Sequence, residues 1–209
     1  MNVGTWLIGL GCVLCVGCGE SDGGNGSGSD GLSEAAVESF EGIYQVTTFT
    51  ENDTGCDGPG ADVLATSSDQ YFVLVSDQVF GIATLMLISC SDVDDCNMKV
   101  SSLRNRESFG FQFGATLSEE VNDSTLTGFT AFTGFEEGGV CVMREYEENT
   151  LTRAGNTATL DTVVKGLDDR PAEDGFCTVN PSAAQEEAAG APCVASSSVV
   201  GDRVADLQP

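Results

Sequence analysis

Apolar and polar side chains alternate with a period of two along much of the chain between residues 40 and 164, and this alternation constrains the fold more than any other feature. In the clearest stretch, 109–117, Phe, Ala and Leu occupy every second position, with Gly, Gln and Thr between them. Successive side chains of a strand point to opposite faces of a sheet, so the pattern predicts strands with one buried face. Gly, Asn and Asp interrupt it at short intervals, which indicates antiparallel strands joined by turns.

The pattern predicts about eight strands and an all-β fold. The expected strands are 43–49, 70–75, 79–89, 97–101, 109–117, 125–133, 140–147 and 157–164. The stretch 79–90 is apolar on both faces, which predicts a strand covered from each side or a barrel strand under a loop. The alternation stops after Val164, and Pro181 followed by 182–189 predicts a short C-terminal helix.

Strands joined by short turns can close into an antiparallel up-and-down β-barrel or stack as a two-sheet β-sandwich. The closed barrel removes exposed sheet edges, but the strand pattern hardly separates the two folds. We predict the barrel, followed by the short helix, and keep the sandwich as the alternative.

A short apolar run, 3–17, ends at Cys18. It is shorter than the ~20 apolar residues that cross a membrane, and it has the length of the apolar part of a signal peptide. Gly17 directly before Cys18 resembles the lipobox of bacterial lipoproteins, whose cysteine is linked to diacylglycerol and becomes the mature N-terminus. The resemblance implies that 1–17 is a signal peptide, that Cys18 is lipidated, and that the partner there is a membrane.

The same resemblance implies a location. In such lipoproteins an Asp after the lipidated cysteine favours the inner membrane, and Gly19 stands there instead, so an outer-membrane anchor is expected. Residues 18–34 are rich in Gly, Ser and Asp and predict a flexible linker. Residues 35–209 are long enough for one domain with its own core, and show no internal repeat.

Six cysteines lie beyond the predicted linker: Cys56, Cys90, Cys96, Cys141, Cys177 and Cys193. An even number in an exported chain predicts three disulfides. Cys90 and Cys96 bracket a short acidic turn and are the natural local pair, and pairs of Cys56 with Cys141 and of Cys177 with Cys193 would follow. The chain has no histidine, and no Cys-x₂-Cys spacing occurs among these six, so we expect no zinc, iron–sulfur cluster or other cofactor.

The formal net charge is -25, with only 8 basic residues. Such a chain repels phosphate backbones, which excludes nucleic acid as a partner. Ser-His-Asp and Cys-His catalysis are excluded because histidine is absent. Two carboxylates can still hydrolyse a glycosidic bond, and Glu145 and Glu147 share one face of a predicted strand, although a solvated face is the simpler interpretation.

Four aromatic residues are candidates for an apolar pocket at a barrel mouth: Phe109, Phe111, Phe113 and Phe132. A packed core is the competing interpretation, because a sheet core also requires aromatics at alternate positions. Gly42-Ile43-Tyr44 at the head of the first predicted strand is similar to the Gly-x-Trp signature of lipocalins, with Tyr replacing Trp. That resemblance implies an eight-stranded barrel, followed by a helix, that carries a small hydrophobic ligand.

Three functions therefore stay open. The chain looks like the uncharacterised cysteine-rich lipoproteins of Gram-negative bacteria, and the first expectation is a non-catalytic module that binds an unknown protein or glycan. The second is a lipocalin-like carrier of a small hydrophobic ligand. The third is a carboxylate-dependent hydrolase of cell-wall or polysaccharide substrates.

Overall fold

The computed structural model describes residues 31–58, 60–79, 82–105, 113–173, 175–178 and 180–207. The predicted signal peptide, Cys18 and most of the predicted linker lie outside these ranges. None of the helices within them is long and apolar enough to cross a bilayer.

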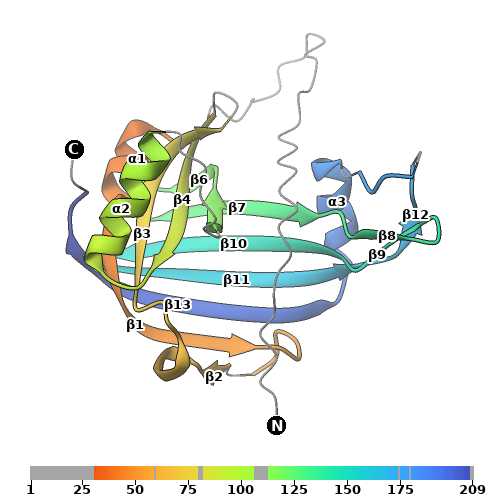
Figure 1. Ribbon diagram of the computed structural model, residues 1–209, viewed down its shortest axis with the longest axis horizontal. Helices are drawn as coiled ribbons and strands as arrows, with labels where there is room; N and C mark the ends of the chain where they lie inside the picture. Colours follow the sequence, from red (N-terminus) through yellow and green to blue (C-terminus); the bar gives the residue numbers. More distant parts are fainter. Residues whose placement is uncertain are drawn as a thin grey trace.

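Most of the described chain forms antiparallel strands (Figure 1). The main sheet contains β1 (Gly42–Asn52), β2 (Ala61–Asp62), β3 (Tyr71–Val79), β4 (Ile82–Cys90), β5 (Phe113–Leu117), β6 (Glu119–Asn122), β7 (Thr125–Phe132), β10 (Arg144–Ala154), β11 (Thr157–Leu167) and β13 (Cys193–Ala205). A small second sheet contains β8 (Phe135–Glu137), β9 (Val140–Val142) and β12 (Arg170–Pro171). The helices are α1 (Glu34–Phe40), α2 (Val93–Arg104), α3 (Pro181–Ala188) and the short 3₁₀ helix η1 (Leu64–Thr66).

The main sheet nearly closes into a barrel. Its strand order is β5-β4-β3-β1-β13-β11-β10-β7-β6, so each long strand pairs with its neighbour along the chain and β13 returns to β1. The two ends of this order, β5 and β6, are separated in the chain by Ser118 alone, and the Ser118 amide donates to the Thr127 carbonyl oxygen over 3.0 Å. The main strands thus form one curled up-and-down sheet and not the two stacked layers of a sandwich.

Gly128 of β7 permits this closure. A Cβ atom built there would lie 1.9 Å from the carbonyl oxygen of Thr116 in β5. Only a residue without a side chain allows two backbones to approach so closely.

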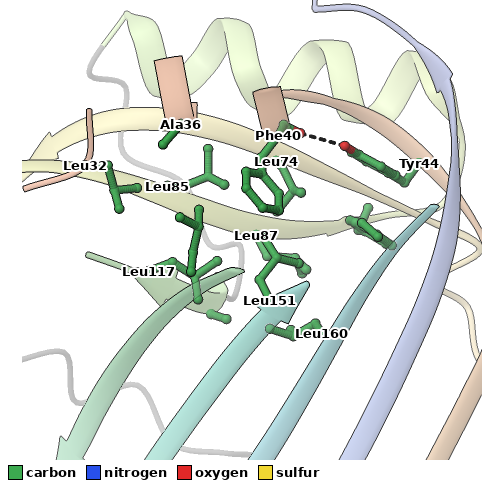
Figure 2. Packing of buried hydrophobic residues seen from close by; sticks show 14 of the residues in the cluster. Leu32, Ala36, Phe40, Tyr44, Leu74, Leu85, Leu87, Leu117, Leu151 and Leu160 are labelled. Atoms are coloured by element: carbon green, nitrogen blue, oxygen red, sulfur yellow. Dashed lines mark hydrogen bonds between the residues drawn. The ribbon is translucent and has the colours of Figure 1, made fainter. Parts of the chain in front are cut away.

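One end of the barrel is closed by α1 and filled with apolar side chains. Figure 2 shows Ala36 and Phe40 of α1 in a cluster with leucines from β3, β4, β5, β10 and β11. Ser33 caps α1 by accepting from the Ala36 amide over 3.2 Å, and the Tyr44 hydroxyl donates to the Phe40 carbonyl oxygen over 2.7 Å. Burying one Phe or Leu side chain contributes ~1.5–3 kcal/mol, so this end stabilises the fold and leaves little space for a ligand.

The predicted strand 97–101 is wrong, because these residues belong to α2. Asp92 caps this helix by accepting from the Asp95 amide over 2.8 Å. Cys96, Val100 and Leu103 follow helical spacing and pack on the outer face of β3 and β4. This explains why β4, which contains most of the stretch 79–90, is apolar on both faces: the barrel core covers one face and α2 covers the other.

The predicted C-terminal helix is confirmed as α3, which Asn180 caps by accepting from the Ala183 amide over 3.2 Å. The domain does not end there, since the long strand β13 follows and joins β1 to β11. We did not predict β13. Its positions facing the barrel interior are mostly small (Ala195, Ser197, Gly201), so no apolar alternation marks the strand.

Three disulfides connect the six described cysteines. The predicted Cys90–Cys96 pair is confirmed, but the other two pairs are Cys56–Cys193 and Cys141–Cys177, not Cys56–Cys141 and Cys177–Cys193. The error follows from the missed strand: β13 begins beside the end of β1, which brings Cys193 to Cys56 with a Cα–Cα distance of 5.8 Å. Three disulfides indicate an oxidising compartment outside the cytoplasm.

Candidate functional site

The inner face of the barrel changes from apolar to polar along the long strands. Strand register aligns residues of β7, β10, β11 and β13 in rows across this face. One row is apolar, and contains Leu126, Leu151, Leu160 and Val199; a row with Arg153, Ala158 and Gly201 lies beyond it toward the closed end. On the other side of the apolar row, the next three rows contain Gly128, Asn149, Thr162 and Ser197, then Thr130, Glu147, Val164 and Ala195, then Phe132, Glu145 and Gly166. We call these three rows the polar inner face.

The polar inner face lies where the sheet is incompletely paired. In the described ranges β6 pairs with β7 only from Thr125 to Thr127, and β3 pairs with β1 only from Gly42 to Gln45. The long strands continue past these pairings toward α3 and the small sheet, on the side of the molecule opposite α1 and α2 (Figure 1). The polar residues are therefore at the open end of the barrel.

A chain of hydrogen bonds crosses the polar inner face from β11 to β10. The Thr162 hydroxyl donates to Asn149 Oδ1 over 2.8 Å, and Asn149 Nδ2 donates to Glu147 Oε1 over 2.8 Å. Asn149 is fully buried, whereas Glu147 is half-buried and Glu145 is exposed. A buried amide with both ends bonded has one orientation, so it holds the Glu147 carboxylate in place.

The electrostatics of this face shift the pKa of Glu147 upward. Burial raises the pKa of Glu147 above its ordinary value, the negative charge of Glu145 raises it further, and the hydrogen bond from Asn149 offsets part of the shift. Glu51 extends the Asn149 row onto β1 opposite Ser197, and burial together with the charge of Asp53 raises its pKa as well. No position in the three rows carries a lysine or arginine, so these carboxylates have no cation beside them within the polar inner face.

A small pocket of about 90 Å³ lies on the apolar side of these rows. It is lined by Val46, Phe49, Asp69, Tyr71, Phe72, Leu87, Ser89 and Val199. Pockets for drug-sized ligands measure ~300–1,000 Å³, so this pocket is suited to a few waters or a small substituent of a ligand.

Two of the four residues of the predicted aromatic site lie within the described part of the chain. Phe109 and Phe111 lie outside the described residues, and Phe113 begins β5. Phe132 is half-buried in the outermost row of the polar inner face, with its ring edge-on to that of Phe135 at 5.3 Å. The aromatic residues that line the small pocket are instead Phe49, Tyr71 and Phe72, which we did not single out because their strands show no distinctive aromatic pattern.

Covalent and ionic links brace the open end. The Cys56–Cys193 disulfide joins the segment after β1 to the start of β13, and the Cys141–Cys177 disulfide joins β9 to the segment before α3. Arg144 at the start of β10 pairs with Glu187 of α3. A rim held in this way is pre-organised, which lowers the entropic cost of binding a ligand.

No protein-family model, curated protein or solved structure matches this chain. Its function therefore has to be inferred from its own residues. Within the described ranges, no group of three or more cysteine, aspartate or glutamate residues is arranged to hold a metal ion.

Proposed function

We propose that this protein is an exported lipoprotein that acts as a non-catalytic binding module, with the polar inner face as its ligand site. The main observation that supports this proposal is the fully buried Asn149, which is hydrogen-bonded to both Thr162 and Glu147. Burying polar groups costs free energy that apolar side chains of the same size avoid, and the neighbouring row, with Leu126, Leu151 and Leu160, is apolar. Local departures of this kind from optimal core packing are expected at functional sites.

The ligand is expected to be a small molecule with an amine. Glu51, Glu145 and Glu147 offer carboxylate oxygens, Thr130 and Thr162 offer hydroxyls, and the rows contain no cation. An ammonium group donates hydrogen bonds to carboxylates, and its positive charge would favour the ionised form of Glu147. A sugar ring beside the amine would also find an apolar contact in Phe132.

The location forms part of the proposal. A diacylglycerol anchor on Cys18 would tether the domain to the outer membrane through the predicted linker. The three disulfides support export, since such bonds persist in oxidising compartments. The domain would thus collect its ligand close to the membrane surface.

The binding proposal is tested with glucosamine and glucose, which differ in that glucosamine has an amine in place of one hydroxyl group. Glucosamine is expected to raise the melting temperature of the wild-type protein and to titrate by calorimetry, and glucose is expected to do neither. Glu147→Gln should abolish the effect, while Glu148→Gln on the outer face should preserve it. Equal responses to both sugars, or an unchanged response in Glu147→Gln, would contradict the proposal.

A carboxylate-dependent hydrolase is the second candidate, favoured by one observation. Glu145 and Glu147 lie two positions apart on the polar inner face, which separates their Cα atoms by ~6.6 Å along the strand. Paired carboxylates of glycosidases stand ~5–9.5 Å apart, and a raised pKa suits Glu147 as the general acid, with Glu145 as base or nucleophile.

The two candidates are separated by incubating the protein with purified peptidoglycan and with chromogenic glycosides. Release of reducing sugar by the wild-type protein, lost in both Glu145→Gln and Glu147→Gln, would establish the hydrolase. Binding of glucosamine without turnover of any of these substrates would favour the binding module.

The lipocalin-like carrier is the weakest of the three proposals. It is supported by the up-and-down strand order and by the position of Gly42-Ile43-Tyr44 at the head of β1. A hydrophobic ligand needs a large apolar cavity, yet the closed end is filled by the protein's own side chains and the pocket beside it is small.

A further inference from the structure

Two turns of this protein share a three-residue pattern and a local structure. Asn52-Asp53-Thr54 closes β1, and Asn122-Asp123-Ser124 connects β6 to β7. Asn-x-Ser/Thr, with x other than Pro, is the acceptor pattern for N-glycosylation in exported proteins. The compartment indicated by the disulfides is one in which this modification can occur.

The asparagine side chain has the same orientation in both turns. Asn122 Oδ1 accepts from the Ser124 amide and from the Ser124 hydroxyl, each over 3.0 Å. Asn52 Oδ1 accepts from the Thr54 amide over 3.1 Å and from the Thr54 hydroxyl over 2.9 Å. With the oxygen held inside the turn, the amide nitrogen on the other side of the group faces away from it.

The two nitrogens differ in their surroundings. Asn52 Nδ2 donates to the Asp57 carbonyl oxygen over 3.2 Å, and its side chain is half-buried. Asn122 is exposed, as are all the residues of β6, and its Nδ2 has no hydrogen-bond partner in the described part of the chain. A transferase can therefore reach the nitrogen of Asn122 without breaking an internal contact, whereas that of Asn52 is already bonded.

We propose that Asn122 is N-glycosylated in the exported protein and that Asn52 is not. The donor would be an oligosaccharide linked to a polyprenyl diphosphate. Asn122 Nδ2 attacks C1 of the first sugar, the C1–N bond forms as the C1–O bond to phosphate breaks, the polyprenyl diphosphate leaves, and the amide gives one proton to a base of the transferase. No oxidation or reduction is involved.

A glycan at this turn would leave the polar inner face free. Asn122 pairs with Thr125 at the start of β7, and Phe132 at the other end of that strand belongs to the open end. The seven steps along the strand from Thr125 to Phe132 separate its two ends by ~23 Å. The modification would instead cover the exposed edge formed by β6, which is a site for unwanted strand pairing.

The test uses the full chain purified from its own membrane, by intact mass and by sequencing of the peptide that contains Asn122. We expect a glycan on Asn122 and an unmodified Asn52. Asn122→Gln and Ser124→Ala should each remove the glycan from this peptide, Ser124→Thr should retain it, and Asn52→Gln should leave it unchanged. Circular dichroism of the four variants reports whether each is folded. An unmodified Asn122 peptide in the native protein, or a glycan that survives Ser124→Ala, would overturn the proposal.

Discussion

The Arg144 guanidinium and the Glu187 carboxylate form a two-point ion pair, with Nη1–Oε1 at 3.0 Å and Nη2–Oε2 at 2.8 Å. Arg144 lies on the outer face of β10 with only 2% of its side chain exposed, and Glu187 comes from α3. The pair attaches α3 to the outer face of the barrel, where Tyr146 and Leu167 pack against Ala184 and Ala188 of the same helix.

Removing the carboxylate of Glu187 should destabilise the domain, because Arg144 would keep its charge while buried. We expect Glu187→Gln to lower the free energy of unfolding by about 1–3 kcal/mol, as measured by urea denaturation. The neighbouring Glu186→Gln, on an exposed position of the same helix, should change it by less than about 0.5 kcal/mol. Equal effects of the two variants would contradict a specific role for the ion pair.

The same pair predicts part of the acid sensitivity. The hydrogen bond from Arg144 lowers the pKa of Glu187 below its ordinary value. A carboxyl group with a lowered folded-state pKa contributes stability above its unfolded pKa, and that contribution is lost as the pH falls through the folded pKa. Thermal unfolding of the wild type and Glu187→Gln should therefore differ most near pH 7 and converge in acid.

Glu147 should affect the pH dependence of stability in the opposite direction to Glu187, because its folded-state pKa is raised, chiefly by burial. The folded state then holds a proton that the unfolded state has released, so this group reduces stability as the pH rises from its unfolded pKa to its folded pKa. Glu147→Gln should gain stability relative to the wild type as the pH increases through that range, and Glu148→Gln should not. A stability difference independent of pH would contradict the raised pKa.

Among the polar residues inside the barrel, Asn149 should be the one whose substitution lowers the stability of the domain most. Truncation in Asn149→Ala leaves the Thr162 hydroxyl and Glu147 without their shared partner, and should cost about 1–3 kcal/mol in denaturant unfolding. Thr162→Val should cost less, about 0.5–1.5 kcal/mol, because Asn149 keeps its bond to Glu147. Additive effects in the double variant would mean that the Thr162–Asn149 hydrogen bond contributes no interaction energy.

Gly128 tests how the barrel closes. Gly128→Ala would place a methyl group against the backbone of β5 and should destabilise the protein severely, by at least about 3 kcal/mol in denaturant unfolding, or prevent folding. Gly190→Ala is the matched control, since no atom lies within 4 Å of a Cβ at that position. A well-folded Gly128→Ala protein with unchanged stability would show that β5 does not pack on β7.

The disulfide arrangement predicts unequal contributions to stability. Cys56–Cys193 spans a sequence separation of 137 and Cys90–Cys96 a separation of 6, which correspond to about 5 and about 2 kcal/mol if the bonds act by restricting the unfolded chain. Replacing both cysteines of the first pair by serine should therefore cost more than replacing both of the second. Non-reducing peptide mapping should find Cys56 joined to Cys193, and a Cys56–Cys141 peptide would contradict the arrangement.

Local chemistry was sufficient for several features of this protein. Period-two alternation predicted antiparallel strands and an all-β domain, because it requires no knowledge of which segments are neighbours. Pro181 followed by 182–189 predicted α3, and the short spacing of Cys90 and Cys96 predicted their disulfide. Each of these depends on residues within a few positions of one another.

The remaining features depend on contacts between distant segments. The alternation of apolar and polar side chains shows which residues share a face of a strand but not which face is inside. The sequence therefore did not reveal that Glu145 and Glu147 face the barrel interior. The short segment 97–101 suits a strand or a helix, and burial against β3 and β4 decided for the helix. β13 is recognisable only once β1 and β11 lie on either side of it, and it is this strand that brings Cys193 to Cys56. The sequence by itself therefore determined most of the strands and the oxidising compartment. Tertiary pairing alone decided β13, barrel closure, two of the three disulfides and the polar inner face, because strand register is set by partners far apart in the chain.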